Sequence, residues 1–457
     1  MIIYDFLVFK FRVYTIYSRN LFIITQIKLR KDDGVVMPIT ADLHIHSRFS
    51  RATGKDLNLQ NLEKWALVKG VDLLGTGDFT HPKWIEEIKE NLEDDGTGIL
   101  KSKTGYPFVL QSELSLIYTQ DGKGRKVHLV LLAPNLDVVK QITDYLLKKG
   151  RVDYDGRPIF GIPCPEFTEQ MKKIDDKIEV IPAHAWTPWF GIFGSNGGFD
   201  SVEACFKDQA KHIHALETGL SSDPPMNWRL SKLDRFSLLS FSDLHSFWPW
   251  RIGREATIFD IKLTYDNLIK AIRTKEGLVE TIEVDPNYGK YHFTGHRNCR
   301  VCLDPKESRK LKHICPKCGK PLTVGVLERV EELADRPEGF RPHGAKPFRT
   351  LIPLSEIISK LLGRAIATQA VWKEYNNLMA NFKSEYNILL NVPEEELRKF
   401  TSLKIAEMII KNRQARIEVL PGYDGEYGIP VFSDEDRKQA EDTETKILQK
   451  QTSLSDF

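Results

Sequence analysis

Two histidines separated by one residue begin the part of the sequence that could carry out metal chemistry. His44 and His46 lie in the segment ADLHIHS, which begins at Ala41. In an extended strand, side chains two positions apart share a face, so both imidazoles point one way while Leu43 and Ile45 pack on the other. Neutral imidazole is a common metal ligand, so the pair could clamp an ion. Histidine pairs also occur without a metal, so support must come from elsewhere in the chain.

More histidine and acidic residues occur at the margins of later apolar runs. These runs have the length of strands and occupy 71–82, 106–115, 127–134, 177–186, 214–220 and 236–246. Segments with helical periodicity alternate with them at 57–70, 135–150 and 265–277. This alternation predicts an α/β barrel or a doubly wound sheet, in which the carboxyl ends of the strands form the active site.

Most of the candidate ligands follow a predicted strand, whereas His128 lies near the start of one. A single buried histidine usually only donates a hydrogen bond, but their joint placement predicts a shared metal centre. The predicted ligands are His44, His46, Asp78, His81, Glu113, His128, His184, Asp243 and His245. Within this set, the predicted catalytic residues are His44, His46, Asp78, Glu113, His184 and Asp243.

The overall composition bounds the class of protein. A chain of 457 residues predicts two or three domains, and the net charge of +2 means that any nucleic-acid surface must be local. Four of the six cysteines fall in one cluster, which favours an intracellular, cytoplasmic protein over a disulfide framework. Charges interrupt the apolar segment 1–36, so it lacks a membrane span. We expect either an additional strand or hairpin there, or a start codon assigned before the true start at Met37.

The cysteine cluster consists of two CxxC pairs separated by twelve residues. This spacing is typical of a structural zinc ribbon with four cysteine ligands, Cys299, Cys302, Cys315 and Cys318. Basic residues outnumber acidic ones around the pairs, which predicts either a phosphate-binding patch or a solvated loop. The candidate DNA contacts in this patch are Arg297, Arg300, Lys310 and Lys312.

A loop that interleaves aromatic residues with glycines follows His184, over residues 186–206. Aromatic rings can stack on a base extruded from DNA, and glycines allow its backbone to approach closely. The same rings could instead pack over the mouth of the barrel. The candidate base-binding residues are Trp186, Trp189, Phe193, Gly197, Gly198 and Phe199.

Several separated motifs resemble the PHP (polymerase and histidinol phosphatase) family of metal-dependent phosphoesterases. They are HIHS, GDFTH, SELS, the single His128, PAHAW and SDLHS, in this order across 42–260. The resemblance implies a distorted (β/α)7 barrel with a multinuclear metal site that takes Zn, Mg or Mn. Many members carry another histidine shortly after the first motif, and residues 47–55 have none. The resemblance leaves open whether Asp78, His81 or both serve the second motif.

A PHP-like barrel followed by a basic zinc ribbon and a helical region resembles the endonuclease Q family, as does ETGLSSDP at 217–224. This resemblance implies that damaged DNA is the partner. It also implies nicking on the 5′ side of deaminated bases (uracil, hypoxanthine and xanthine) and at abasic sites. Two alternatives are a PHP-type phosphatase that acts on a small phosphate monoester and a non-catalytic zinc-ribbon protein that binds nucleic acid.

The composition predicts five segments: an extension over 1–36, the catalytic barrel over 37–280, the ribbon region over 281–345, a helical region over 346–420 and a flexible tail over 421–457. The tail ends in Gln451, Leu454 and Phe457, which share one face if the segment is helical. This terminal box resembles the clamp-binding box of repair proteins, which implies a sliding clamp as a second partner. A chance match of a short motif is the alternative.

Overall fold

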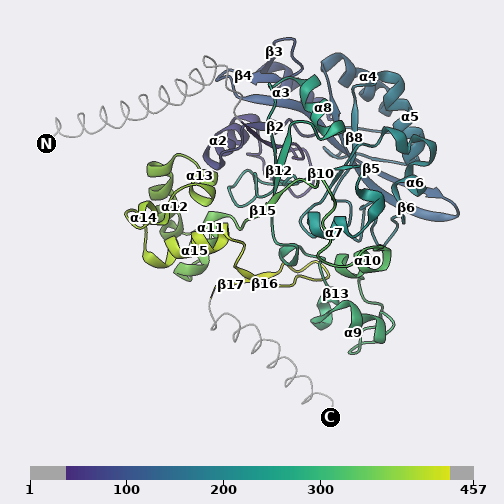
Figure 1. Ribbon diagram of the computed structural model, residues 1–457. Coiled ribbons are helices and arrows are strands. Elements are labelled where there is room, and N and C mark those ends of the chain that lie inside the picture. The colour runs from purple at the N-terminus through teal and green to yellow at the C-terminus, as the bar shows by residue number, and fades with distance from the viewer. Residues whose placement is uncertain (1–37, 433–457) are drawn as a thin grey trace.

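The computed structural model describes residues 38–432 (Figure 1). The predicted extension over 1–36 and the terminal box of Gln451, Leu454 and Phe457 lie outside the described residues. Among residues 38–432, no helix combines the length and the apolar character that crossing a membrane requires.

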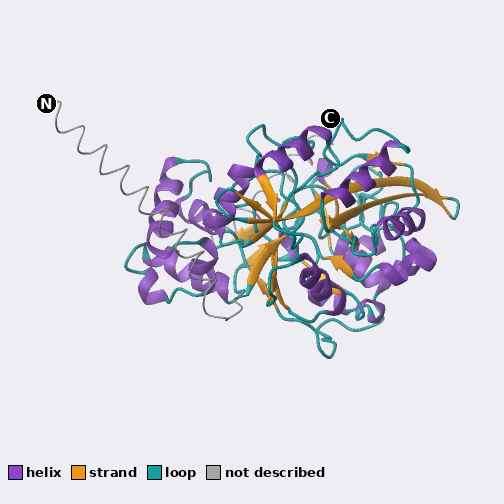
Figure 2. Cartoon of the chain, turned by 90° about the horizontal axis from the view of Figure 1, so that it is seen from above, coloured by secondary structure: helices purple, strands orange, loops and turns teal. Residues whose placement is uncertain are grey.

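A mixed sheet of eleven strands forms the frame of the molecule, and the mixed α/β fold is as predicted. Its main path runs β15-β12-β11-β1-β2-β5-β4-β3, and β6, β7 and β8 join through β5 and β6. In Figure 2 the strands gather around a common centre and most helices lie outside them. The strands are β1 (Ile39–Asp42), β2 (Leu73–Gly75), β3 (Leu92–Asp94), β4 (Leu100–Ser102), β5 (Pro107–Gln120), β6 (Lys123–Ala133), β7 (Ile159–Phe160), β8 (Glu179–Pro182), β11 (Ala256–Phe259), β12 (Leu278–Glu283) and β15 (Phe348–Thr350).

Side-chain caps define where most helices of this frame begin. The Asn58 side chain accepts a hydrogen bond from the Asn61 backbone at the start of α2, and Asn135 does the same for Val138 in α4. A left-handed Gly70 with φ of 96° ends α2. The helices of this part are α2 (Leu59–Lys69), α3 (Pro82–Asn91), α4 (Leu136–Leu147), α5 (Cys164–Ile174), α6 (Val202–Phe206), α7 (Pro224–Trp228) and α8 (Tyr265–Thr274), with 3-10 turns η1 (Lys207–His212) and η2 (Ser231–Leu233).

Strands β5 and β6 form a long antiparallel pair that extends beyond the runs expected from the sequence. Their register places Glu113 opposite Val130 and Ser115 opposite His128. Glu113 and His128 therefore lie in the middle of their strands, not at the predicted ends. The prediction was wrong because the polar residues that lengthen each strand carry no apolar signal. A separate parallel pair, β9 (Ala215–Glu217) and β10 (Ser237–Leu239), completes the frame around the site.

The region after the barrel contains the ribbon, a helical bundle and a final hairpin. The ribbon comprises η3 (Pro286–Tyr288), β13 (Thr294–His296), η4 (Arg297–Cys299), β14 (Val301–Leu303), α9 (Pro305–Lys310) and α10 (Val326–Leu333). The bundle comprises α11 (Leu354–Leu362), α12 (Gln369–Phe382), α13 (Glu385–Leu390), α14 (Glu394–Leu397) and α15 (Leu403–Arg413), and the hairpin comprises β16 (Glu418–Leu420) and β17 (Ile429–Val431).

The predicted start of a flexible tail at residue 421 was wrong for residues 421–432. The hairpin packs on the ribbon region through backbone hydrogen bonds. Phe293 donates to the Gly422 carbonyl at 3.0 Å, and Gly428 donates to the Tyr288 carbonyl at 3.1 Å. Glycine-rich sequence here serves tight turns rather than disorder, because a Cβ at Gly428 would lie 2.0 Å from the Asn287 carbonyl oxygen.

A buried ion pair joins the helical bundle to the barrel. Lys69, at the end of α2, is 1% exposed, and its Nζ donates to Glu385 Oε1 at 2.6 Å and to the Pro249 carbonyl at 2.9 Å. The other oxygen of Glu385 accepts from the Tyr375 hydroxyl at 2.8 Å. Every charged group of the pair thus has hydrogen-bonded partners, which a buried pair requires to offset its desolvation.

We expect Glu385→Ala to destabilise the protein strongly, because it leaves the Lys69 ammonium buried without its partner. Breaking a buried pair in this way costs about 3–5 kcal/mol. Urea unfolding followed by circular dichroism measures the change. Asp144→Ala, which removes an exposed partner of Lys140, is the matched control and should leave the unfolding midpoint in place. Equal midpoints for the two variants would show that the buried pair contributes no stability.

Candidate metal centre

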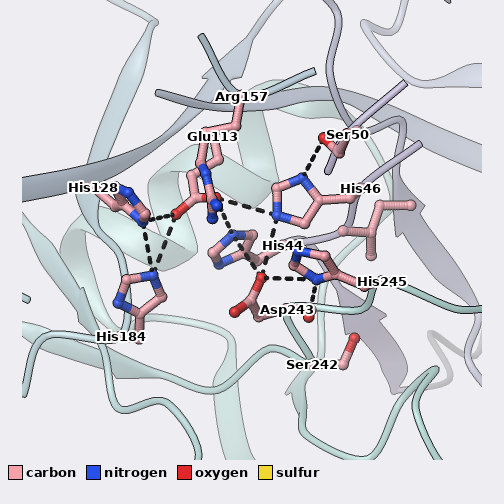
Figure 3. Close-up of polar contacts among 12 residues, drawn as sticks. His44, His46, Ser50, Glu113, His128, Arg157, His184, Ser242, Asp243 and His245 are labelled. Atoms are coloured by element: carbon pink, nitrogen blue, oxygen red, sulfur yellow. Dashed lines mark hydrogen bonds and ion pairs between the residues drawn. The ribbon is translucent and has the colours of Figure 1, made fainter. Parts of the chain in front are cut away.

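Four side chains from three parts of the chain point toward one another (Figure 3). His44 and His46 follow β1, Glu113 lies in β5, and Asp243 lies beyond β10. One ligand atom from each lies within 4.8 Å of the others, and this set is called the first ligand group. Its closest approaches join His46 Nε2 to Glu113 Oε2 and to Asp243 Oδ1, both at 3.2 Å. Imidazole nitrogens and carboxylate oxygens at this spacing are suited to a divalent metal.

A second ligand group consists of Glu113, His128 and His184, whose ligand atoms also lie within 4.8 Å of one another. His128 Nδ1 lies 2.8 Å from Glu113 Oε1, and His184 Nε2 lies 3.2 Å from the same oxygen. Glu113 is therefore shared: its Oε2 faces the first group and its Oε1 faces the second. Glu113 could therefore contribute one oxygen to each group if metals are bound.

The backbone conformation at three residues turns their side chains toward the centre. Asp78, His184 and Asp243 have φ angles of 42°, 30° and 46°, in the left-handed region that favours glycine. Each such residue costs about 1–3 kcal/mol, so surrounding contacts must hold it. For His184, one contact is the backbone N–H, which donates to Glu217 Oε2 at 2.8 Å. Strain concentrated at these residues is typical of a functional site.

Two carboxylates behind the histidines fix the orientation of their rings. Glu217 Oε2 lies 2.9 Å from His44 Nδ1, and Asp78 Oδ1 lies 3.1 Å from His46 Nδ1. Both contacts occupy the far nitrogen and leave Nε2 facing the first ligand group, as carboxylates behind metal-binding histidines do. Asp78 Oδ2 also accepts from Ser47 Oγ at 2.6 Å.

Asp78 lies behind His46 and outside both ligand groups, so its predicted ligand and catalytic roles stay predictions. His81 also lies outside both groups, and its ring stacks on Phe49 with 4.3 Å between centroids. His245 lies beside the first group, with its ring 4.5 Å from that of His46, and its ligand role stays a prediction. Glu217 was assigned no site role from the sequence, although a charged residue within the apolar run over 214–220 was a usable signal.

The electrostatics of the buried centre favour a bound cation. Burial lowers the pKa of His44, but Glu217 and Glu113 outweigh burial and raise that pKa well above its ordinary value. Burial raises the pKa of Glu113, yet Arg157, His128 and His44 hold it well below its usual range. The carboxylates therefore stay charged and attract positive charge, which protons on histidines or metal ions can supply.

A nitrogen of His44 that makes no hydrogen bond and the neutral state of two other histidines also favour a bound metal. His44 Nε2 is fully buried and makes no hydrogen bond, so a metal would satisfy it. Burial lowers the pKa of both His128 and His245 to about 4. These two imidazoles are neutral at physiological pH, and neutral imidazole is the form that binds metal. The residues present therefore fit divalent metals in the barrel.

A cavity of about 660 Å³ opens in front of the centre. His128, His184 and Asp243 line its floor, and the other lining residues include four cations and five aromatic side chains: Arg157, Arg251, Arg254, Lys290, Trp189, Phe190, Phe241, Tyr291 and Tyr427. Sequence reasoning missed all of these except the two in the aromatic loop. Lys290, Tyr291 and Tyr427 come from the ribbon and the final hairpin, so their placement depends on tertiary contacts that no local motif reveals.

The aromatic loop is only partly at this cavity. Trp189 lines it, whereas Trp186, Phe193 and Phe199 are buried in the core. The Trp186 Nε1–H donates to Asn227 Oδ1 at 2.8 Å. The predicted stacking of these three rings on a base was therefore wrong, because packing against the barrel already covers them. Gly197 and Gly198 line a different cavity, beside the β5–β6 hairpin.

Three residues of the cysteine cluster and one histidine form a group that could hold a metal ion. The four ligand atoms within 4.8 Å of one another belong to His296, Cys299, Cys315 and Cys318. His296 Nδ1 lies 3.4 Å from Cys318 Sγ. Cys302 lies in β14 opposite Gly295 and outside this group, and its predicted role as the fourth cysteine ligand stays a prediction. The predicted DNA contacts Arg297, Arg300, Lys310 and Lys312 are all exposed, and their role stays a prediction.

We expect Cys315→Ser to lose the ribbon zinc and to lower thermal stability, because such ribbons fold around their metal. Cys302→Ser is the matched control and should keep one zinc per ribbon, whereas His296→Ala should release it. Plasma emission spectrometry of metal content, with the melting temperature, measures both effects. Zinc loss from Cys302→Ser and retention by His296→Ala would restore the ligand set predicted from the sequence.

Comparisons with known proteins agree with this architecture. Residues 353–416 match the family model described as the MJ0043 C-terminal domain. The chain is 33% identical over 297 residues to the uncharacterized protein MJ0043 of Methanocaldococcus jannaschii, and the match covers 62% of this chain but only 35% of that protein. It is 30% identical over 410 residues to the uncharacterized protein YqxK of Bacillus subtilis, which covers 85% of this chain and 98% of YqxK.

Two solved structures are similar over nearly their whole length. The lesion-specific endonuclease PfuEndoQ from Pyrococcus furiosus is 30% identical with a TM-score of 0.78, and the match covers 87% of this chain and 96% of that one. An endonuclease Q in complex with a 27-mer duplex carrying an abasic lesion at the active site is 31% identical with a TM-score of 0.79. The match covers 87% of this chain and 98% of that one. The chain belongs to the endonuclease Q family.

Proposed function

We propose that this protein is a metal-dependent DNA repair endonuclease that nicks the phosphodiester bond on the 5′ side of deaminated bases and at abasic sites. The observation that carries the proposal is the shared Glu113, which joins two ligand groups at the floor of a cationic and aromatic cavity. Support also comes from the likeness to a lesion-specific endonuclease and to a complex with a lesion-containing duplex. Uracil, hypoxanthine and xanthine are the proposed bases.

Within this proposal, the ligands of the barrel metals are His44, His46, Glu113, His128, His184 and Asp243, with His245 beside them. Bound Zn, Mg or Mn would lower the pKa of a water molecule and neutralise charge on the scissile phosphate. Glu217 and Asp78 keep two of the imidazoles aimed at the centre.

The cations of the cavity would hold the phosphates of the strand. Arg157 Nη1 lies 2.9 Å from Glu113 Oε2, and its side chain is 25% exposed toward the cavity. It can therefore contact a phosphate beside the metal centre while it stays anchored. Arg251 and Lys290 lie farther out along the wall, next to the Tyr427 ring. An abasic nucleotide offers no base to stack, so its capture must depend on contacts of this kind.

The aromatic side of the cavity would receive an extruded base. Trp189 contacts Tyr291 edge-on with 5.4 Å between ring centroids, and Tyr427 lies under Lys290, whose Nζ is 4.6 Å from the ring. Tyr427 is fixed because the final hairpin packs on the ribbon region. Rigid rings beside a metal centre suit stacking on a flipped base.

The two alternatives make different use of the same residues. A phosphatase for small phosphate monoesters would need the ligand groups but not the exposed basic ribbon or the aromatic wall. A non-catalytic binding protein would leave the strained, buried ligand groups without a role. Metal-dependent nicking of a uracil-containing duplex, run beside hydrolysis of a chromogenic phosphate monoester, separates the three functions.

We expect His44→Ala and Asp243→Ala each to abolish nicking of the uracil-containing duplex, because each removes a member of the first ligand group. Binding of the same duplex should stay within a few-fold of wild type, since the ribbon and the cavity wall are intact. Gel assays of nicking and fluorescence anisotropy measure the two quantities. His343→Ala, at an exposed histidine far along the chain, is the control. Full cleavage by either ligand variant would overturn the metal-centre assignment.

We expect Tyr427→Ala to weaken discrimination between uracil-containing and normal DNA, because it removes part of the aromatic wall. Base stacking is worth about 1–3 kcal/mol, so the ratio of nicking rates should fall on the order of tenfold. Tyr427→Phe keeps the ring and should keep the ratio. Nicking of an abasic duplex should change less, since it presents no base. An unchanged ratio in the alanine variant would exclude Tyr427 from base recognition.

The sliding clamp remains a proposed second partner, through Gln451, Leu454 and Phe457. Such a segment would place an apolar pair in a groove of the clamp while the glutamine donates a hydrogen bond beside it. We expect deletion of residues 451–457 to abolish clamp binding in a pull-down while nicking without the clamp is unchanged. Retained clamp binding by the truncated protein would place the binding segment elsewhere.

A further inference from the structure

A cluster of five aromatic side chains lies beside the loop that carries Asp243. It comprises Trp65 of α2, Phe247, Trp248 and Trp250 of the loop after β10, and Trp372 of α12, and it is called the tryptophan cluster. It holds four of the eight tryptophans of the chain. The rings of Trp248 and Trp250 are parallel within 3°, with centroids 5.4 Å apart. The rings of Trp65 and Trp372 lie 5.2 and 5.5 Å from Trp248.

The exposure of this cluster is unusual for so much aromatic surface. Trp248 lies at its centre and yet is 37% exposed, and the other four rings are only half-buried. Packing of the helical bundle on the barrel accounts for the buried sides of Trp65 and Trp372. It does not account for the open face of Trp248. An exposed group of large apolar side chains usually marks a binding surface.

The cluster is continuous with the catalytic cavity along one loop. The same loop contributes Asp243 and His245 to the metal centre and returns with Arg251, which lines the cavity. Phe247, Trp248 and Trp250 occupy the residues between. A strand that runs from the cavity along this loop would therefore meet these rings.

Hydrogen bonds hold the loop rigidly at both ends and in its middle. Asp42 accepts from the Ser242 and Gly253 backbone N–H groups, both at 3.0 Å. In the middle, Lys69 Nζ donates to the carbonyl of Pro249, which lies between the two parallel tryptophans. The rings are thus fixed relative to the metal centre, and a preorganised surface loses little entropy on binding.

Two basic residues, Lys64 and Arg251, lie next to residues of the tryptophan cluster. Lys64 Nζ lies 5.5 Å from the Trp65 ring centroid, and its side chain is exposed. Arg251 follows Trp250 directly and points to the cavity. Aromatic planes combined with cations that can reach phosphates are the features of surfaces that bind unpaired nucleic acid.

We propose that the tryptophan cluster is a binding site for unpaired nucleobases of the DNA strand next to the catalytic cavity. This inference rests on the proposed function, because it takes the strand in the cavity to be DNA. Extrusion of a nucleotide unstacks its neighbours, and those neighbours lose a stacking partner. Trp248 offers one, and stacking on tryptophan accepts any base because every base has a π-face.

The test compares Trp248→Ala with Trp248→Phe in the full-length protein. The probes are a fluorescein-labelled oligothymidylate of thirty nucleotides and an undamaged blunt duplex of equal length, at one fixed salt concentration. We expect Trp248→Ala to weaken oligothymidylate binding on the order of tenfold, as loss of one stacked base does. Trp248→Phe should stay within threefold of wild type, and duplex binding should stay within twofold for both. Leu147→Ala, at a leucine that is 54% exposed in α4, is the control for loss of exposed apolar surface.

Three results would overturn the proposal. The first is unchanged binding of oligothymidylate by Trp248→Ala. The second is an equal loss in the phenylalanine variant. The third is a change confined to the melting temperature or to the oligomeric state in gel filtration, which would assign the cluster to packing or to contact between copies. Wild-type protein that binds oligothymidylate through Trp248 but fails to nick lesion-containing duplexes would leave this site intact and overturn the proposed function instead.

Discussion

The arrangement of the site depends on one buried carboxylate. Glu113 is fully buried, yet Arg157 and the surrounding histidines keep its pKa well below the usual range. A charge in the interior must be compensated, and here the compensating groups are the side chains that could bind metal. Because its two oxygens face different histidines, one residue determines that there are two ligand groups and that they adjoin. The position of Glu113 in the middle of β5 then places the centre on the longest pair of strands in the frame.

The loops around this carboxylate are held against their own conformational preferences. Asp78, His184 and Asp243 lie in the left-handed region, and each is fixed by contacts with other loops. Close packing contributes too: a Cβ at Gly219 would lie 2.7 Å from the His184 Cβ, so a larger residue there would displace the imidazole. Backbone strain of this kind persists only where the surrounding contacts outweigh its cost. The buried carboxylates of Glu217 and Asp78, behind the histidines, supply such contacts.

The sequence predicted the parts of this site that leave a local signal. Alternating apolar runs and helical periodicity predicted the α/β fold, and polar residues beside those runs predicted His44, His46, Glu113 and the other members of the two ligand groups. The sequence did not predict the features of the site that depend on contacts between distant segments of the chain. His296 joins Cys299, Cys315 and Cys318 in the group that could hold a metal, and the register of β13 with β14 places Cys302 opposite Gly295. Trp186 and Trp189 have the same local composition around them, but tertiary packing buries one and leaves the other on the cavity wall.

The helical bundle is connected by hydrogen bonds to the loop over 242–253, which carries Asp243. Glu385 receives the Lys69 ammonium, which also holds the Pro249 carbonyl, and the Tyr386 hydroxyl donates to the carbonyl of Gly253. Gly253 in turn donates to Asp42, directly before the His44 motif. The bundle, matched over 353–416 by a family model, thus contacts the loop that carries Asp243 and is linked through Gly253 to the segment that carries His44 and His46. A short chain of buried hydrogen bonds therefore links the helical bundle to the two segments that carry Asp243 and His44.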